Sequence, residues 1–164
     1  WSAAGNIDEQ LLKRLLNHPF FTLTGPRSTG KEAFNLPWLK KLLGQSTAIT
    51  PGDVQTTLVE FTAKSIALAI KHHALLPTEI FVCGGGAHNT HLMQRLAVHA
   101  EPARLDTTAA LGLDPDWVEA AAFAWLACQT LASSAGNAPV VTGAAGERIL
   151  GGIYPGGEPT RGAS

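Results

Sequence analysis

The stretch CGGGAHN, residues 83–89, has the residue types and spacing of a phosphate-binding turn. Successive glycines let a ligand approach the backbone closely, and the asparagine after them can cap a helix whose N-terminus is positively polarised. Gly84, Gly85, Gly86 and Asn89 are therefore candidate nucleotide-binding residues. A tight strand-to-helix turn without any ligand is an equally good interpretation of the spacing alone.

A dinucleotide is a competing ligand for the same turn. Gly84 and Gly86 follow an apolar run, and Asp106 lies twenty positions beyond Gly86, where a ribose-binding acid would stand. Asn89, however, replaces the third glycine of that fingerprint, and only one strand-helix-strand unit is visible where the dinucleotide fold needs two halves. Asp106 is more simply interpreted as an acid at the end of a strand.

Glu119 is a further candidate because it is the only charged residue in the apolar stretch 117–133. On a helix it aligns with Phe123 and Leu126, and a carboxylate on an apolar face is costly unless it is paired or functional. The helix dipole would explain an acid at a helix start, but a helix that begins near Asp114 places Glu119 beyond its first turn. We therefore expect a functional role for Glu119.

Residues 25–32, GPRSTGKE, fit the phosphate-loop template G-x-x-x-x-G-K-[ST] except at the last position, where Glu32 replaces the hydroxyl. A carboxylate there would face the phosphates that the loop should bind. Pro37 would also interrupt a helix that started at Lys31 within two turns. We therefore expect a surface loop that leads into a short helix.

The histidines and cysteines have simpler explanations than catalysis. His88 and His91 could share a helical face, but no acid or cysteine is spaced to complete a zinc site with them, so no metal site is predicted. Cys83 and Cys128 are expected to be small buried thiols rather than a disulfide framework. No serine or cysteine lies in a recognisable nucleophile motif.

The elements that must position the candidate residues begin with two helices. Asn6 can cap the first helix, whose leucines share one face and which ends in the stretch NHPFF, residues 17–21. Thr50, Pro51 and Asp53 are typical of the start of a second, long helix. The apolar stripe of this second helix is predicted to be Val54, Leu58, Phe61 and Leu68, and its negative end carries Lys71, His72 and His73.

The glycine turn lies inside a predicted unit of strand, turn, helix and strand. Residues 79–83, EIFVC, are a short apolar strand that leads into the turn. Asn89 then caps the helix THLMQRLAVHA, residues 90–100, and residues 103–107, ARLDT, form the next strand.

The chain beyond the second strand is predicted to be mostly helical. The sequence Asp114-Pro115-Asp116, residues 114–116, begins an alanine-rich helix that runs to about Ser133. Trp117 and Trp125 are expected to fill the core on this helix, which is apolar nearly all round. Residues 148–154, RILGGIY, are predicted to be a last strand, although paired glycines are unfavourable there.

Length and composition limit the possible functions. The chain has 164 residues, enough for one compact domain over residues 1–154, and the tail 155–164 is predicted to be disordered. Twelve basic and thirteen acidic residues without a block of like charge argue against nucleic acid as a partner. No apolar run spans a bilayer and no leader opens the chain, so we expect a cytoplasmic protein without a membrane partner. Trp1 is not an initiator methionine, and we expect a piece of a larger protein.

These stretches together resemble the C-terminal portion of one family, the anhydro-N-acetylmuramic acid kinases of bacterial cell-wall recycling. The resembling segments, in chain order, are HPFF, RSTGKEAFNLPWL, DVQTTLVEFTAKSIA, VCGGGAHN, DWVEAAAFAWLA, GNAPVVTGA and ILGGIYPG. The resemblance implies an α/β fold that is the C-terminal lobe of an actin-like (ribonuclease H-like) sugar kinase, with a mixed sheet flanked by helices. A dinucleotide-binding oxidoreductase domain and a non-catalytic interaction module of the same fold are the alternatives.

The resemblance also implies roles for individual residues. The glycine turn would contact the adenosine side of ATP, and Glu119 would face the sugar. His88 stands where many relatives have arginine. The STG loop is a family signature between helices, in which the usual lysine and arginine are exchanged as Arg27 and Lys31. The nucleotide-side residues that carry over are Gly84, Gly85, Gly86 and Asn89.

The family's phosphate-binding segment and the aspartate that serves as general base have no counterpart in residues 1–164. We expect both upstream of residue 1, so this chain alone should be inactive. In the whole enzyme, the resemblance implies that the base activates water to open the 1,6-anhydro ring while the sugar's 6-oxygen attacks the γ-phosphate of ATP with Mg²⁺ bound, giving N-acetylmuramic acid 6-phosphate. The implied partners are the sugar, ATP, the N-terminal lobe and a second copy in a homodimer.

Overall fold

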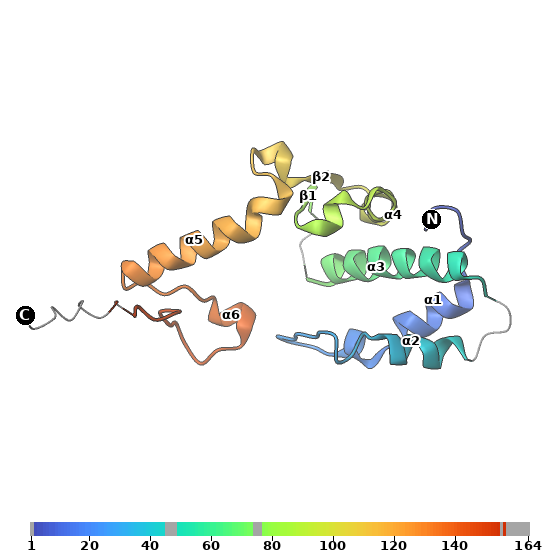
Figure 1. Cartoon of the computed structure of the whole chain (residues 1–164), viewed down its shortest axis with the longest axis horizontal. Helices are drawn as coiled ribbons and strands as arrows, with labels where there is room; N and C mark the ends of the chain where they lie inside the picture. Colours follow the sequence, from blue (N-terminus) through green and yellow to red (C-terminus); the bar gives the residue numbers. More distant parts are fainter. Residues whose placement is uncertain (1, 45–48, 74–76, 155, 157–164) are drawn as a thin grey trace, which may run out of the picture. The chain divides into compact units, whose positions relative to one another are not determined.

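The computed structural model describes residues 2–44, 49–73, 77–154 and 156. These residues form a helix-rich α/β structure, and the only sheet among them has two parallel strands (Figure 1). Contacts divide the chain into two compact units, Trp1–Glu119 and Ala120–Ser164. The single lobe over residues 1–154 stays a prediction, and the predicted tail lies outside the described residues apart from Gly156.

The first unit begins with helix α1 (Glu9–Leu16), whose buried leucines form part of the core. The expected cap at Asn6 is wrong, because Asp8 Oδ1 accepts the hydrogen bond from Leu11 N at 2.7 Å. Asn6 instead donates its backbone N–H to Asp53 Oδ1 at 2.6 Å. The acid two positions later therefore starts the helix, and Asn6 connects it to the next long helix.

Helix α3 (Pro51–His73) starts as predicted, with Asp53 N donating to Thr50 Oγ1 at 3.2 Å. Its predicted apolar stripe is wrong at Leu68, which is exposed. α3 packs against both α1 and α4, and close approach on two sides favours small residues over large ones. The residues that α3 buries are Thr56, Thr57, Val59, Glu60, Ala63 and Ala67.

A cluster of aromatic rings lies beside a short 3-10 helix, η1 (Pro19–Thr22), and helix α2 (Leu36–Leu43). Asn35 Oδ1 caps α2 by accepting from Trp38 N at 2.9 Å, so residues 23–34 are the expected loop into a short helix. Neighbouring rings pack edge-on or tilted, with centroids 4.6 to 6.4 Å apart. The ring-bearing residues are His18, Phe20, Phe21, Phe34, Trp38 and Phe61.

Both strands around the glycine turn are confirmed. Strand β1 (Glu79–Val82) pairs in parallel with β2 (Arg104–Thr107), from Glu79 opposite Arg104 to Val82 opposite Thr107. Helix α4 (Thr90–Ala100) connects them and lies alongside α3 (Figure 1). The parallel register places the carboxyl ends of both strands at one edge, where ligands bind in open α/β sheets.

The predicted strand at 148–154 is wrong, and the predicted mixed sheet is not found in the described part of the chain, where the one sheet is parallel. A strand needs a neighbouring edge, and the described residues of the second unit contain no other strand. Leu150 O instead accepts a hydrogen bond from Thr130 Oγ1, and Gly151 has φ +94°, which an extended strand does not accommodate.

The predicted alanine-rich helix is confirmed, and a short 3-10 turn precedes it. Asp114 Oδ1 accepts from Asp116 N at 2.9 Å and starts a 3-10 turn, η4 (Pro115–Trp117), after which α5 (Val118–Leu131) begins. Helix α6 (Pro139–Thr142) is the only other helix that the structure describes in residues 120–164.

Two burial predictions on and near these elements are wrong. Trp117 and Trp125 are exposed rather than core, and the thiols of Cys83 and Cys128 are exposed as well. A helix that is apolar all round is predicted to have packing neighbours on every side. The described residues after α5, however, contain only α6 and irregular chain, so much of the apolar surface of α5 stays exposed. Cys83 directly follows the last residue of β1, Val82, at the carboxyl edge of the sheet, and its thiol is exposed there.

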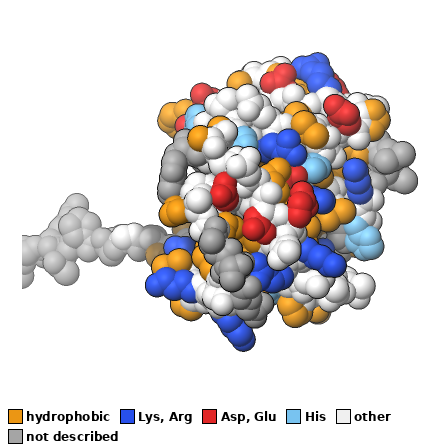
Figure 2. All heavy atoms as spheres, turned by 90° about the vertical axis from the view of Figure 1, so that its right-hand side faces the viewer, with side chains coloured by type: hydrophobic (Ala, Val, Ile, Leu, Met, Phe, Trp, Pro, Cys, Tyr) orange, Lys and Arg blue, Asp and Glu red, His pale blue; other side chains and the backbone are white. Residues whose placement is uncertain are grey.

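The surface shows no large single-sign region on the face drawn in Figure 2, where acidic and basic side chains are interspersed with hydrophobic ones. Among the helices that the structure describes, none combines the length and the hydropathy that a bilayer span requires.

Candidate nucleotide-binding site

The glycine turn lies between β1 and α4, at the carboxyl edge of the sheet. Gly84 has φ +74° and ψ −179°, a conformation that is essentially restricted to glycine. A 3-10 turn, η2 (Gly85–His88), follows, and Gly84 N donates to Pro115 O at 2.9 Å. The backbone of Gly84 therefore explains one of the three glycines by conformation alone.

Gly85 and Gly86 are not explained by the fold. Neither has a positive φ. A Cβ added at Gly85 would have no described heavy atom within 4 Å, and one at Gly86 would meet only Leu92 Cδ2, at 3.8 Å. The folded chain would accept side chains at both positions, so neither packing nor backbone conformation requires a glycine there.

Asn89 caps α4, since its Oδ1 accepts the hydrogen bond from Leu92 N at 3.0 Å. This confirms the predicted helix start and aims the positive end of the helix dipole at the glycine turn. The side-chain oxygen is thus already used by the helix. A nucleotide contact by Asn89 stays a prediction.

His88 and Asp116 form an ion pair beside the turn, which sequence reasoning did not find. His88 Nε2 lies 2.8 Å from Asp116 Oδ1 and 3.0 Å from Oδ2, with 62% and 57% of the two side chains exposed. The hydrogen bond that His88 donates to Asp116, and then the charge of Asp116, raise the pKa of His88 above the ordinary value of 6.5. The separation of 28 residues left no local signal.

Asp106, the acid considered for a dinucleotide ribose, is bonded within its own strand. Arg104 Nη2 donates to Asp106 Oδ2 at 3.0 Å, and Thr107 N donates to Oδ1 at 2.8 Å. These hydrogen bonds, that of Arg104 first, lower the pKa of Asp106. Asp106 is therefore a strand-end acid, as its simpler interpretation had it.

Glu119 lies in the first turn of α5 and its side chain is exposed. The expectation that it lies beyond the first turn is wrong, because the regular helix starts at Val118 after the η4 turn. The helix dipole therefore favours an acid here, and the described residues impose no burial cost on it. The argument that Glu119 must be functional because it is a carboxylate on an apolar helix face therefore no longer holds. A role of Glu119 toward the sugar stays a prediction.

The loop that resembles a phosphate loop is folded in a different way. Glu32 Oε1 accepts the N–H of Gly30 at 2.7 Å, which occupies a donor that a phosphate would need. Arg27 donates to the carbonyls of Phe20 and Leu23, and its guanidinium carbon lies 5.1 Å from the centre of the Phe20 ring. Arg27 thus anchors the loop to the aromatic cluster.

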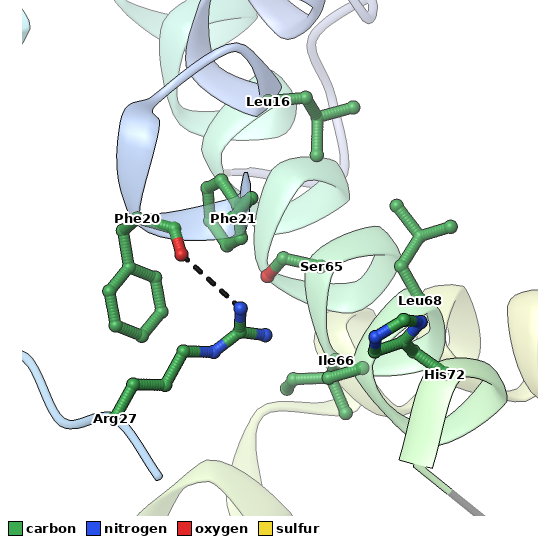
Figure 3. A pocket seen from close by; sticks show the side chains of 9 residues that line it. Leu16, Phe20, Phe21, Arg27, Ser65, Ile66, Leu68 and His72 are labelled. Carbon is green, nitrogen blue, oxygen red and sulfur yellow. Dashed lines mark hydrogen bonds between the residues drawn. The ribbon is translucent and has the colours of Figure 1, made fainter. Parts of the chain in front are cut away.

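Figure 3 shows the cavity of about 460 Å³ that Arg27 borders, between η1 and α3. Its walls are mainly apolar, and two of its lining residues are joined by the hydrogen bond from Arg27 to Phe20 O. The cavity is separate from the glycine turn, since it shares no lining residue with residues 84–89. Its lining residues are Leu16, Phe20, Phe21, Arg27, Ser65, Ile66, Leu68, Ala69 and His72.

A buried ionic cluster holds α4 against α3. Glu60, only 4% exposed, accepts from Arg95 Nε at 2.6 Å and Arg95 Nη2 at 3.1 Å, and His99 Nε2 lies 2.7 Å from its Oε1. Burial by itself would raise the pKa of Glu60, but the hydrogen bonds from Arg95 and His99 outweigh it and lower the pKa. The spacing of Arg95 and His99 on one helical face was the available signal.

No group of three or more histidine, cysteine or acidic side chains is placed to hold a metal ion in the described part of the chain. His91, considered with His88 for zinc, has its Nδ1 3.1 Å from Ser2 Oγ. The prediction of no metal site in this chain stays a prediction.

Comparison with known proteins identifies the family of the chain. The model of the family described as anhydro-N-acetylmuramic acid kinase matches residues 1–156. The chain belongs to the anhydro-N-acetylmuramic acid kinase family.

The relatives of this kinase family align over nearly the whole chain. Relatives named anhydro-N-acetylmuramic acid kinase are 50% identical over 155 residues in Pseudomonas syringae pv. tomato and 52% identical over 156 residues in Thiobacillus denitrificans. One from a Shewanella species (strain MR-7) is 51% identical over 155 residues. Each alignment covers 94% of this chain but only 42 to 43% of the relative, so the chain spans less than half the length of these kinases.

Proposed function

We propose that this chain is the nucleotide-binding lobe of an ATP-dependent kinase that opens the 1,6-anhydro ring of anhydro-N-acetylmuramic acid and phosphorylates its 6-oxygen. Family membership supports the reaction class, and the α/β structure is consistent with an actin-like fold. The dinucleotide-binding alternative lacks support, because Asp106 is bonded to its own strand.

The observation that carries the proposal is the glycine turn. Gly85 and Gly86 need neither a special φ nor extra space inside the fold, yet they stand directly before the N-terminus of α4. Phosphate groups bind at such helix ends because backbone N–H groups and the helix dipole point toward them. A nucleotide that lies against residues 84–86 accounts for glycines that packing does not explain.

The residues present suit ATP better than they suit a dedicated Mg²⁺ site. The turn offers backbone donors, whereas the described residues contain no acidic cluster that would hold Mg²⁺ by itself. Mg²⁺ neutralises charge on the transferred phosphoryl group in kinases of this kind, and it would enter with ATP. The lobe's own task is to bind and orient the nucleotide.

The reaction balances as a coupled hydrolysis and phosphoryl transfer. A water oxygen bonds to C1 of the sugar and gives its proton to a general base, while the bond between C1 and the 6-oxygen breaks. The freed 6-oxygen bonds to the γ-phosphorus, and the bond to ADP breaks, so the products are ADP and N-acetylmuramic acid 6-phosphate. We place the general base in the part of the kinase that lies outside residues 1–164, and Glu119 as a sugar contact.

The test uses a full-length kinase that carries these residues, supplied with MgATP and the anhydro sugar. We expect ADP release that depends on the sugar and a product whose mass exceeds that of the anhydro sugar by one phosphoryl group (HPO3) and one water. ADP release that ignores the sugar, or a folded protein that binds ATP without turnover, would contradict the proposed reaction. A second copy as a dimer partner belongs to the proposal and is tested by light scattering of the same sample.

The role of Glu119 has its own variant. Glu119→Gln keeps the shape and removes the charge, and we expect kcat to fall at least about tenfold, which corresponds to about 1.4 kcal/mol of barrier. Stability should stay within about 0.5 kcal/mol, because the side chain is exposed. Glu147→Gln, an exposed acid in the second unit, is the matched control and should keep wild-type turnover. Full activity of Glu119→Gln would show that Glu119 does not serve the reaction.

A further inference from the structure

We propose that His88 and Asp116 form a clamp that positions the glycine turn for the nucleotide and ties it to the segment that carries Glu119. The proposal rests on the proposed function of the turn and names two positioning residues that neither the family match nor the resemblance provides. The clamp consists of the His88–Asp116 pair and the adjacent bond from Gly84 N to Pro115 O.

Two contacts with η4 hold the chain on either side of Gly85 and Gly86. The turn is held at its first glycine, where Gly84 N donates to Pro115 O at 2.9 Å, and again at His88, 2.8 Å from Asp116. Both anchors belong to consecutive residues of η4. Gly85 and Gly86 lie between the two attachment points, so the bonds limit the conformations that these glycines can adopt.

Stability does not explain the pair. Its side chains are more than half exposed, and an exposed ion pair contributes little to the free energy of unfolding. Glycines, in contrast, lose more conformational freedom than other residues when they become ordered. A clamp that orders them before the nucleotide arrives reduces the entropy that binding would otherwise lose, which is how preorganisation strengthens binding.

Asp116 of the clamp is also close in sequence to Glu119, the proposed sugar contact. Asp116 lies in the η4 turn, Val118 continues with helical φ −59° and ψ −43°, and Glu119 follows in the first turn of α5. Asp116 and Glu119 are three residues apart on this continuous path, and both belong to the first unit. The position of the glycine turn is therefore connected through His88 to the backbone at Glu119.

The charge on His88 makes the clamp sensitive to pH. Hydrogen bonding and charge from Asp116 favour the protonated ring, and Asp114 adds a smaller favourable charge. Since the pKa of His88 is raised, the paired form is complete below pH 6.5 and is lost as pH rises through the raised value. The titratable or charged side chains on the elements packed against η2 are Asp116 in η4, Asp114 that caps η4, and His91, Arg95 and His99 in α4.

The experiment measures MgATP binding and steady-state kinetics of the full-length kinase for His88→Ala, Asp116→Asn and the double variant. We expect each single variant to raise the Kd and KM for ATP about twofold to fivefold, the range of an exposed pair. The double variant should be no worse than either single one, because both remove the same interaction. The midpoint of urea unfolding should not move.

Two further variants separate the clamp from a merely structural role. His88→Arg can keep the pair with Asp116, so ATP binding should return to the wild-type value. Glu79→Gln breaks another exposed ion pair, in which Glu79 Oε1 lies 3.3 Å from Arg104 Nη1 at the opposite end of the same strands, and should leave ATP binding unchanged. ATP's own titration is common to all variants, so between pH 6 and 9 only the wild type should show an additional loss of affinity that His88→Ala and His88→Arg lack.

The outcomes distinguish the two proposals. Wild-type protein that does not bind MgATP would overturn both the nucleotide site and the clamp. Wild-type binding that the His88 and Asp116 variants leave unchanged, or additive losses in the double variant, would overturn the clamp alone. A loss that His88→Arg fails to restore would also contradict it, because the charge and its partner would then be irrelevant.

Discussion

The two ends of α4 carry ionic groups that differ in burial and in what they connect. Toward its C-terminal end, Glu60 is buried between Arg95 and His99 and joins α4 to α3. At its N-terminal end, His88 and Asp116 meet in solvent and join the glycine turn to η4. The buried cluster fixes where α4 lies, whereas the exposed pair fixes only a few residues beside the candidate nucleotide site.

This difference separates stability from function along one helix. A buried carboxylate without its partners is strongly unfavourable, so the Glu60 cluster belongs to the fold. An exposed pair contributes little to the free energy of unfolding, so we propose that the His88–Asp116 pair acts by positioning the glycine turn. Substitutions at the two ends should therefore change different measurements.

The largest effect is expected from Glu60→Ala. It leaves the Arg95 guanidinium partly buried without its carboxylate, and we expect unfolding to become easier by about 3 kcal/mol, the lower part of the range for a broken buried pair. Urea denaturation measures the change. Thr62→Ala, on the exposed side of the same helix, is the control and should lose less than about 1 kcal/mol. An equal loss of unfolding free energy in both variants would show that the buried Glu60 cluster contributes no more to stability than the exposed Thr62 side chain.

Gly84→Ala should come next, because φ +74° with ψ −179° is strained for any residue with a side chain. We expect a loss of about 1 to 3 kcal/mol in unfolding free energy, measured by the same denaturation. Gly85→Ala is the matched control. It has ordinary φ and open space around the added methyl group, so stability should rise slightly, by at most about 1 kcal/mol. Similar losses at both positions would contradict the conformational distinction.

The pH dependences of the two ends should run in opposite directions. Because the pKa of Glu60 is lowered, its contribution to stability is complete above pH 4.5 and is lost as pH falls through the lowered value. The difference in unfolding free energy between wild type and Glu60→Ala should therefore shrink in acid. The His88 contribution behaves in the opposite sense and is lost above pH 6.5, where only ATP binding should respond. A gap for Glu60→Ala that is constant down to pH 3 would contradict this assignment.

The locally encoded part of the fold could be predicted from the sequence. Asn89 and Thr50 were recognised as caps because a cap needs only its own residue and the next turn of the helix. The strands on either side of the glycine turn followed in the same way from a short apolar run and its neighbours. The glycine turn itself was visible because three glycines in succession are rare without a reason.

The parts that depended on tertiary partners could not be predicted. Periodicity along α3 favoured Leu68, but the two helices that pack against α3 select small residues, Ala63 and Ala67. Residues 148–154 have strand-like composition, but in the described second unit no strand edge is present to pair with them. The spacing of Arg95 and His99 places them on one face of α4, but a single sequence does not identify Glu60, 35 and 39 positions away, as their shared partner.

The most direct test of the central claim is a calorimetric titration of the full-length kinase with MgATP, comparing wild type with Gly85→Ala. If a nucleotide lies against the glycine turn, the added methyl group should weaken ATP binding at least about tenfold, or about 1.4 kcal/mol, while stability is kept or slightly improved. Unchanged ATP affinity in the stable Gly85→Ala protein would place the nucleotide elsewhere and contradict the account.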